Sequence, residues 1–103
     1  MQLLTIREDG AAHVTLLSRA EVEVVGADHV LLALAGRTTP ANLLRERRAS
    51  LVVVEGTRCT TVGLVPVADL VHEGMTGLAT VVVEVREDSL GIPLRPIGFT
   101  VPA

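Results

Sequence analysis

Lysine is absent from this chain of 103 residues, and Phe99 is its only aromatic residue. Without lysine, Schiff-base chemistry on a protein amine is excluded. Recognition of a phosphate must therefore come from arginine, hydroxyl groups and backbone N–H groups. Nucleic acid is a poor candidate partner, because binding barrels stack bases on aromatic side chains over a positive groove, and this chain has a net charge of −3.

Cysteine and long apolar runs are also scarce. Cys59 is the single cysteine, so no disulfide can form within the chain, and we expect a reducing cytoplasm. The longest apolar run, Val30–Ala35, is too short to span a bilayer. Residues 1–10 lack the basic start and apolar segment of a signal peptide. The sequence therefore predicts a cytoplasmic protein that does not enter the membrane.

Metal ligands and nucleophiles show no recognisable arrangement. His13, His29, His72 and Cys59 do not have the spacing of a zinc site, and we expect no metal. Cys59 follows Arg58, which can lower a thiol pKa, yet no base that would activate it can be identified, so a buried, inert thiol is favoured. The GxSxG pattern of a serine nucleophile is missing. Catalytic residues therefore stay unassigned.

Valine and leucine dominate the half of the chain that is hydrophobic, and turn residues recur between the apolar runs. This pattern is typical of strands in a mostly β protein. The length suits one domain, residues 1–103. We predict a small antiparallel split β-barrel of six or seven strands with one short helix. The expected strands are Gln2–Arg7, Ala11–Ser18, Glu21–Val25, His29–Ala35, Ala49–Glu55, Cys59–Val67 and Leu78–Arg86.

The segments between and after these runs carry further signals. Asp9-Gly10 indicates a hairpin turn. Gly63 and Pro66 predict a bend or an edge position within their strand. We expect 69–77 to be a polar connection with two glycines, and the proline-rich tail after Ser89 to hold one short strand at 98–101.

The segment Gly36–Ser50 (GRTTPANLLRERRAS) predicts a short helix between two strands. Thr38 or Thr39 can act as N-cap, and Pro40 fits a first helical residue because its N–H is not needed there. Free N–H groups at such a helix start can bind an anion. The arginines near the helix end, Arg45–Arg48, are read as solvated charges that favour the helix dipole, with phosphate contact or a subunit ion pair as the alternative.

Two runs of valine, Val52–Val54 and Val81–Val83, do not alternate with polar residues. Both faces of those strands are therefore expected to be buried. In a domain this small, the second face must meet either the helix or another subunit. We predict a homodimer, since the valine and leucine patches would otherwise be too large for a monomer.

Three segments resemble the flavin-binding split barrels of the pyridoxamine 5′-phosphate oxidase-like superfamily. Asp9–Ser18 (DGAAHVTLLS) is similar to the opening hairpin, Gly36–Leu44 (GRTTPANLL) to the phosphate loop and helix, and Arg48–Val53 (RASLVV) to the strand that follows. The likeness spans about residues 3–67. It implies a split-barrel homodimer with FMN in grooves at the interface.

The resemblance also implies roles for individual residues. The strand from His13 to Ser18 would run beside the flavin ring and ribityl chain, and Ala33 would approach the same groove. Arg37 and the two threonines after it would surround the phosphate, and Asn42 would support the helix start. The expected cofactor residues are His13, Val14, Thr15, Leu16, Ser18, Ala33, Arg37, Thr38, Thr39 and Asn42.

Two functions remain open at this point. The first is a flavin-dependent oxidoreductase or flavin carrier of unknown substrate, with FMN or a deazaflavin as cofactor. The second is a cofactor-free dimeric barrel that serves as a binding or structural module. The second is favoured by the absence of lysine, of ring-stacking aromatic residues and of a helix before the first strand. The sequence also departs from the family pattern at Thr38 and Thr39, where the family often has arginine and lysine, and at His13, which replaces a basic residue.

Overall fold

The computed structural model describes residues 1–72 and 75–89, with the side chains of residues 70–72 left aside. Its strands are β1 (Gln2–Ile6), β2 (Ala12–Leu16), β3 (Val22–Val25), β4 (His29–Ala35), β5 (Ala49–Glu55), β6 (Arg58–His72) and β7 (Met75–Ser89). A 3-10 turn, η1 (Arg19–Glu21), joins β2 to β3, and the helix α1 (Thr38–Glu46) joins β4 to β5. The mostly β fold with one helix is confirmed.

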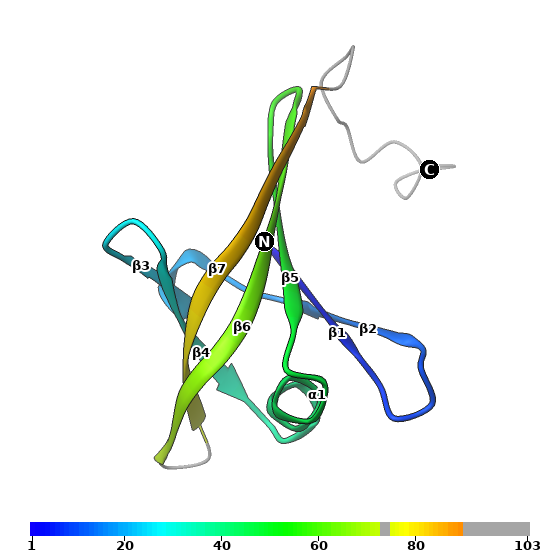
Figure 1. Ribbon diagram of the computed structural model, residues 1–103, viewed down its shortest axis with the longest axis vertical. Coiled ribbons are helices and arrows are strands. Elements are labelled where there is room, and N and C mark those ends of the chain that lie inside the picture. Colours follow the sequence, from blue (N-terminus) through cyan, green and yellow to red (C-terminus); the bar gives the residue numbers. More distant parts are fainter. Residues whose placement is uncertain (73–74, 90–103) are drawn as a thin grey trace, which may run out of the picture.

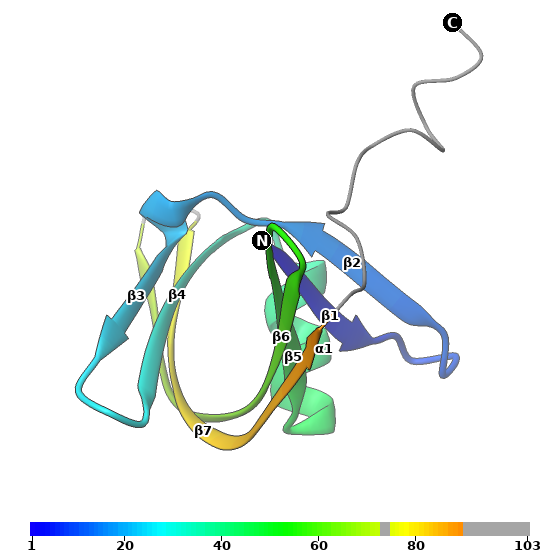
Figure 2. The ribbon, with the colours of Figure 1, turned by 90° about the horizontal axis from the view of Figure 1, so that it is seen from above.

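All seven strands belong to one antiparallel sheet in the order β2-β1-β5-β6-β7-β4-β3. The sheet curls strongly, and α1 lies at one end of it between β4 and β5 (Figure 1). The prediction of a barrel is wrong in one respect, because β2 and β3 are both edge strands and the sheet is not closed. Figure 2 shows the reason, since the β1–β2 hairpin diverges from the β3–β4 hairpin.

The core lies on the concave face of the curled sheet. Alternate residues of β4 are buried, and Leu32 and Leu34 are each 1% exposed. Leu3, Leu64 and Leu78 complete the buried layer from other strands, as a period of two along each strand requires. The helix α1 adds Leu43 to this cluster. The sheet and the helix therefore share one core.

The β6–β7 hairpin is longer than the sequence predicts. We expected 69–77 to be a polar connection, but β6 runs to His72 and β7 starts at Met75. The polar residues do not end the strands. Asp69, for example, lies on the solvent-exposed side of the ribbon, where a charged side chain is accommodated within a strand. The predicted bend is confirmed, since the β6–β7 register shifts between Gly63 and Leu64 and again between Pro66 and Ala68.

The helix begins earlier than expected. Arg37 is the N-cap residue and makes no side-chain capping bond, so the prediction of Thr38 or Thr39 as N-cap is wrong. Pro40 is the third helical residue instead of the first. Proline is tolerated at the third helical position because the first four N–H groups of a helix have no partner within it. At nine residues, α1 is far too short to cross a bilayer, and no other described helix is long and apolar enough to do so.

The outer face of the valine runs stays open to solvent in this chain. Val54 is 43% exposed and Val83 is 63% exposed, so burial of both strand faces is not achieved by one copy. The expected strand at 98–101 lies outside the described residues.

Candidate functional site

The helix α1 is joined to the edge strand β2 by a contact between two hydroxyl groups. Thr15 Oγ1 of β2 and Thr39 Oγ1 of α1 lie 2.7 Å apart, and either can be the donor. Thr39 is 5% exposed, so its hydroxyl is largely shielded from water. Two residues expected at one cofactor groove therefore lie side by side, although they are 24 positions apart in the sequence.

Asn42 fastens the same helix to β1. Its Nδ2 donates to Thr5 Oγ1 at 3.2 Å, and its Oδ1 accepts from Arg45 Nη2 at 3.1 Å. Arg45 Nη2 also donates to the carbonyl oxygen of Ile6 at 2.6 Å. Asn42 is 4% exposed, and its side chain links α1 to β1. Its amide faces protein partners instead of an open groove.

A hollow of about 470 Å³ lies between the exposed face of α1 and the β1–β2 turn. We call it the helix–hairpin hollow. Its lining residues are Arg7, Glu8, Asp9, Thr38, Ala41, Asn42 and Arg45. Of the expected cofactor residues, Thr38 and Asn42 lie here.

The charges in this hollow balance. Arg7 pairs with Asp9 at 3.0 Å, and both side chains are more than half exposed. Arg45 is held by Asn42 and Ile6, while Glu8 adds a second carboxylate. The hollow extends along the side of α1, from Thr38 in the first turn to Arg45 in the last turn. An anion that enters the hollow would meet two guanidinium groups, one hydroxyl and two carboxylates.

The alternation of β2 separates the residues expected beside the flavin. Thr5 and Leu3 of β1 are buried, and they face His13 and Thr15 across the β1–β2 pairing, so these four side chains share the concave face. Val14 and Leu16 point to the opposite face and are 52% and 75% exposed. The strand therefore presents polar groups toward α1 and apolar groups toward solvent.

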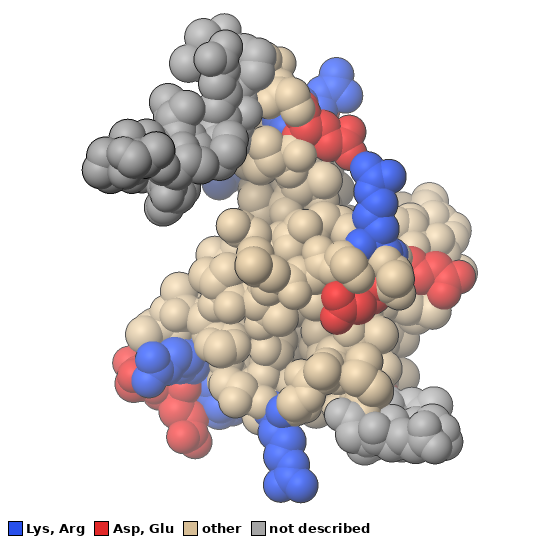
Figure 3. Space-filling model, turned by 180° about the vertical axis from the view of Figure 1, so that it is seen from behind, with Lys and Arg blue, Asp and Glu red and all other residues tan. Residues whose placement is uncertain are grey.

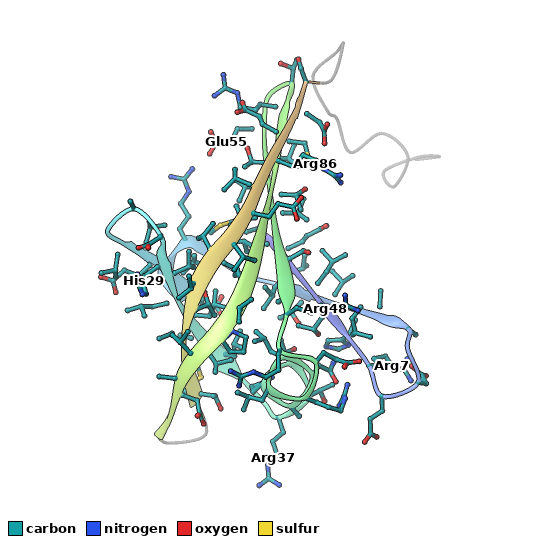
Figure 4. The ribbon with its side chains drawn as sticks, in the orientation of Figure 1. Arg7, His29, Arg37, Arg48, Glu55 and Arg86 are labelled. Carbon is teal, nitrogen blue, oxygen red and sulfur yellow. The ribbon has the colours of Figure 1, made fainter. Side chains whose placement is uncertain are left out.

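Ala33 and Arg37 are two of the expected residues that do not line the hollow. Ala33 belongs to β4, where it pairs with Gly77 of β7 and points away from the buried Leu32 and Leu34. Arg37 projects away from both the sheet and the helix (Figure 4). The helix start explains this direction, because Arg37 is the N-cap residue and precedes the first helical residue.

Ser18, the last expected residue of the first hairpin, stabilises the turn before β3. Its backbone N–H and its hydroxyl both donate to Glu21 Oε1, each at 2.9 Å. These bonds favour the charged carboxylate, so the pKa of Glu21 is lowered, first by the backbone donor and then by the hydroxyl. The structure gives Ser18 a local role in the η1 turn.

Sequence reasoning missed Arg7 and assigned Arg45 to a solvated cluster, with phosphate contact or a subunit ion pair as the alternative. Arg7 immediately precedes the Glu8-Asp9-Gly10 turn, where it was read as the last residue of a strand. Arg45 lies three positions after Asn42, a spacing that puts both on one helix face. That spacing was a usable signal. The approach of the β1–β2 turn to the helix was not visible in the sequence.

A second hollow, of about 300 Å³, lies over the outer face of β1 and β5. Leu4, Ile6 and Ala12 give it an apolar surface, and Ser50 and Arg48 lie beside them. Arg48 follows the helix and lies between β5 and β1 in Figure 4. This surface is contiguous in the sheet with the exposed side of β2, because Ala12 pairs with Ile6.

Groups suited to acid–base or metal chemistry do not gather in the part of the chain that the structure describes. No three histidine, cysteine, aspartate or glutamate side chains there come close enough to hold a metal ion. His29 pairs with Asp28 at 2.8 Å on the surface, and Cys59 is half-buried. The side chain of His72 lies outside the described residues. No catalytic residue is assigned.

Comparison with protein-family models, with curated proteins and with solved structures finds no match to this chain. The three sequence segments quoted above therefore carry the flavin resemblance by themselves.

Proposed function

We propose that this protein binds FMN, with the phosphate in the helix–hairpin hollow. The observation that carries the proposal is the hollow along one side of α1, where Thr38 of the first turn and Arg45 of the last turn line the same space as Arg7. Guanidinium, hydroxyl and backbone N–H groups are the phosphate donors available to a chain without lysine. The hydroxyl contact between Thr15 and Thr39 supports the proposal, because it holds β2 against the first turn of α1.

The flavin ring would lie along β2, where Val14 and Leu16 offer an exposed apolar surface. One chain leaves this surface open to water, whereas cofactor sites bury most of their ligand. A second copy would supply the missing wall, which is why the proposal includes a homodimer. Figure 3 shows, from one side, a broad surface of uncharged side chains, with acidic and basic side chains at its edges and over part of one half.

The proposed activity is that of a flavin-dependent oxidoreductase. A bound flavin supplies the hydride chemistry, and the protein contributes placement and hydrogen bonds. The chain's own residues would orient the phosphate and exclude water from the ring. A deazaflavin could bind the same surface, and the substrate is not specified by any residue described here.

FMN titration of the purified protein tests the proposal. At a hundred times its dissociation constant, FMN should stabilise the protein by about 2.7 kcal/mol and raise its melting temperature. Arg7→Gln should weaken binding at least tenfold, since it removes a charged phosphate donor. Arg19→Gln, in the η1 turn, is the matched control and should bind normally. Arg37→Gln tests the role implied by the resemblance, and normal binding would remove Arg37 from the site.

A cofactor-free dimeric module is the second candidate, and one observation favours it. Glu8 and Asp9 lie in the same hollow as Arg7, and Asp9 already neutralises that arginine. Two carboxylates oppose the entry of a phosphate dianion. If millimolar FMN leaves the melting temperature unchanged, the flavin proposal fails and this candidate replaces it.

A further inference from the structure

The upper part of β7 has an unpaired edge among the described residues. On one side β7 pairs with β6 along its whole length, but its pairing with β4 covers only Met75–Val81. The last contact on that side is the bond from the Val82 N–H to the Asp28 carbonyl at 2.7 Å. Residues 83–89 are all exposed, and they lie on an arm that extends well beyond β3 and β4 (Figure 1).

The pairing pattern identifies which backbone groups face this open edge. Glu55 pairs with Arg58 across a two-residue turn, so the backbone groups of Arg58 face β5. By alternation, those of Thr61 face β7, where Thr61 pairs with Arg86. Arg86 is therefore bonded to β6, and its neighbour Val85 directs its N–H and C=O toward the open edge.

The charges along the edge carry both signs. Glu84 and Arg86 lie on one face of β7, on either side of Val85. Glu87 is already paired with Arg58 at 2.6 Å. In the part of the chain that the structure describes, neither Glu84 nor Arg86 has an ion-pair partner. Glu84 and Arg86 are thus free to form ion pairs, and they flank Val85, whose backbone groups face the open edge.

We infer that two copies of this chain pair edge to edge through β7, antiparallel, with Val85 opposite Val85 of the second copy. A two-fold axis perpendicular to the sheet must pass between a residue and its own copy. Centring the axis on Val85 puts each Glu84 opposite an Arg86 of the other copy. Centring it on Glu84 or on Arg86 would instead put like charges opposite each other, which destabilises a strand pair.

This register also satisfies the backbone. Val85 would donate its N–H to the carbonyl of the second Val85 and accept the reciprocal bond, forming a hydrogen-bonded pair. Exposed strand edges are open to pairing of this kind, and like charges along them usually prevent it. Here the alternation of charge permits the register centred on Val85 and disfavours the registers centred on Glu84 and Arg86. The inference specifies which surface forms the homodimer of the proposed function. It rests on that proposal only in assuming that two copies associate.

Charge exchange on the full chain tests the register, with association measured by sedimentation equilibrium. Glu84→Arg and Arg86→Glu, made singly, should each weaken association about tenfold or more, because like charges then face each other twice. The double variant should restore association to within about threefold of the original. Glu46→Arg, at the exposed end of α1, makes the same charge change elsewhere and should have no effect. Circular dichroism checks that every variant is folded.

Cross-linking gives an independent measurement of the same register. In a hydrogen-bonded antiparallel pair the two Cα atoms are about 5.5 Å apart, within the range of a disulfide. Val85→Cys on a Cys59→Ser background should therefore form a covalent dimer on mild oxidation, while Glu87→Cys on that background should not. Cross-linking at position 87 instead of 85 would overturn the register.

Three results overturn the inference. They are an unaffected dimer in both single variants, a double variant as weak as the singles, and a chain that is monomeric at every concentration. In the first two, the homodimer stands but uses another surface. FMN titration of the same samples reports separately on the cofactor, so failure of the edge pairing and failure of the proposed function are distinguishable.

Discussion

The hydroxyl groups of Thr15 and Thr39 show how one contact links distant parts of the sequence. They join an edge strand to the first turn of the only described α-helix. The sequence identified Thr38 and Thr39 as a pair with the same expected role. The structure distinguishes them, because the helix start leaves Thr38 exposed in the hollow and turns Thr39 into the protein.

A double-mutant cycle measures this contact. Thr15→Val should lower the free energy of unfolding by about 1–3 kcal/mol, since it leaves the shielded Thr39 hydroxyl without its partner. Thr39→Val should have a similar effect, and the double variant should cost clearly less than the sum. We expect a coupling free energy of about 1 kcal/mol from urea unfolding. Strict additivity would contradict the contact.

At the scale of the element, the end of α1 departs from the usual pattern. Helices commonly end with a glycine in the left-handed conformation, but here Arg47 has φ 60° and ψ 28°. Its N–H donates to the Leu43 carbonyl at 2.8 Å, and its guanidinium donates to the Pro66 carbonyl at 3.0 Å. The side chain thus anchors the helix end to β6, beyond the stretch that β5 covers.

Two substitutions separate the backbone cost from the side-chain bond. Arg47→Gly and Arg47→Ala both remove the guanidinium, but only alanine keeps a Cβ in the left-handed region. The glycine variant should therefore be the more stable of the two by about 1 kcal/mol in urea unfolding. Equal stabilities of the two variants would show that position 47 does not hold this conformation in solution.

Strands were predicted well where apolar residues alternate or run together. Bounds such as Ala49–Glu55 and His29–Ala35 agree with the structure because a Gly turn or the helix ends each run. The β6–β7 ribbon was cut short in the prediction, since polar residues at 69–77 resemble a loop when only local sequence is considered. Pairing between the two strands carries the ribbon through that segment.

At the scale of the whole molecule, the exposed valines are the reason for proposing that two copies associate. Val24 is 69% exposed and Val85 is 62% exposed, although both belong to strands of the sheet. Burying such residues between two copies would stabilise the folded chain by mass action. The proposed homodimer would account for these exposed residues.

Concentration dependence of unfolding tests association irrespective of the surface used. If two copies are held together in the folded state, the melting temperature should rise by roughly 3 °C or more for each tenfold increase in chain concentration. Differential scanning calorimetry at several concentrations gives the answer. A melting temperature that does not change would argue for a folded monomer and against the homodimer.

The sequence by itself determined the strand-rich class, the helix between the fourth and fifth strands, and the bend at Gly63 and Pro66. These follow from local preferences, because valine favours strands and glycine and proline disrupt regular pairing. Only the tertiary structure decided that the sheet stays open, that Arg7 and Arg45 line one hollow beside α1, and that β7 has an edge without a strand partner among the described residues. Each of those features depends on strand order and curvature, which bring together residues that local preference cannot relate.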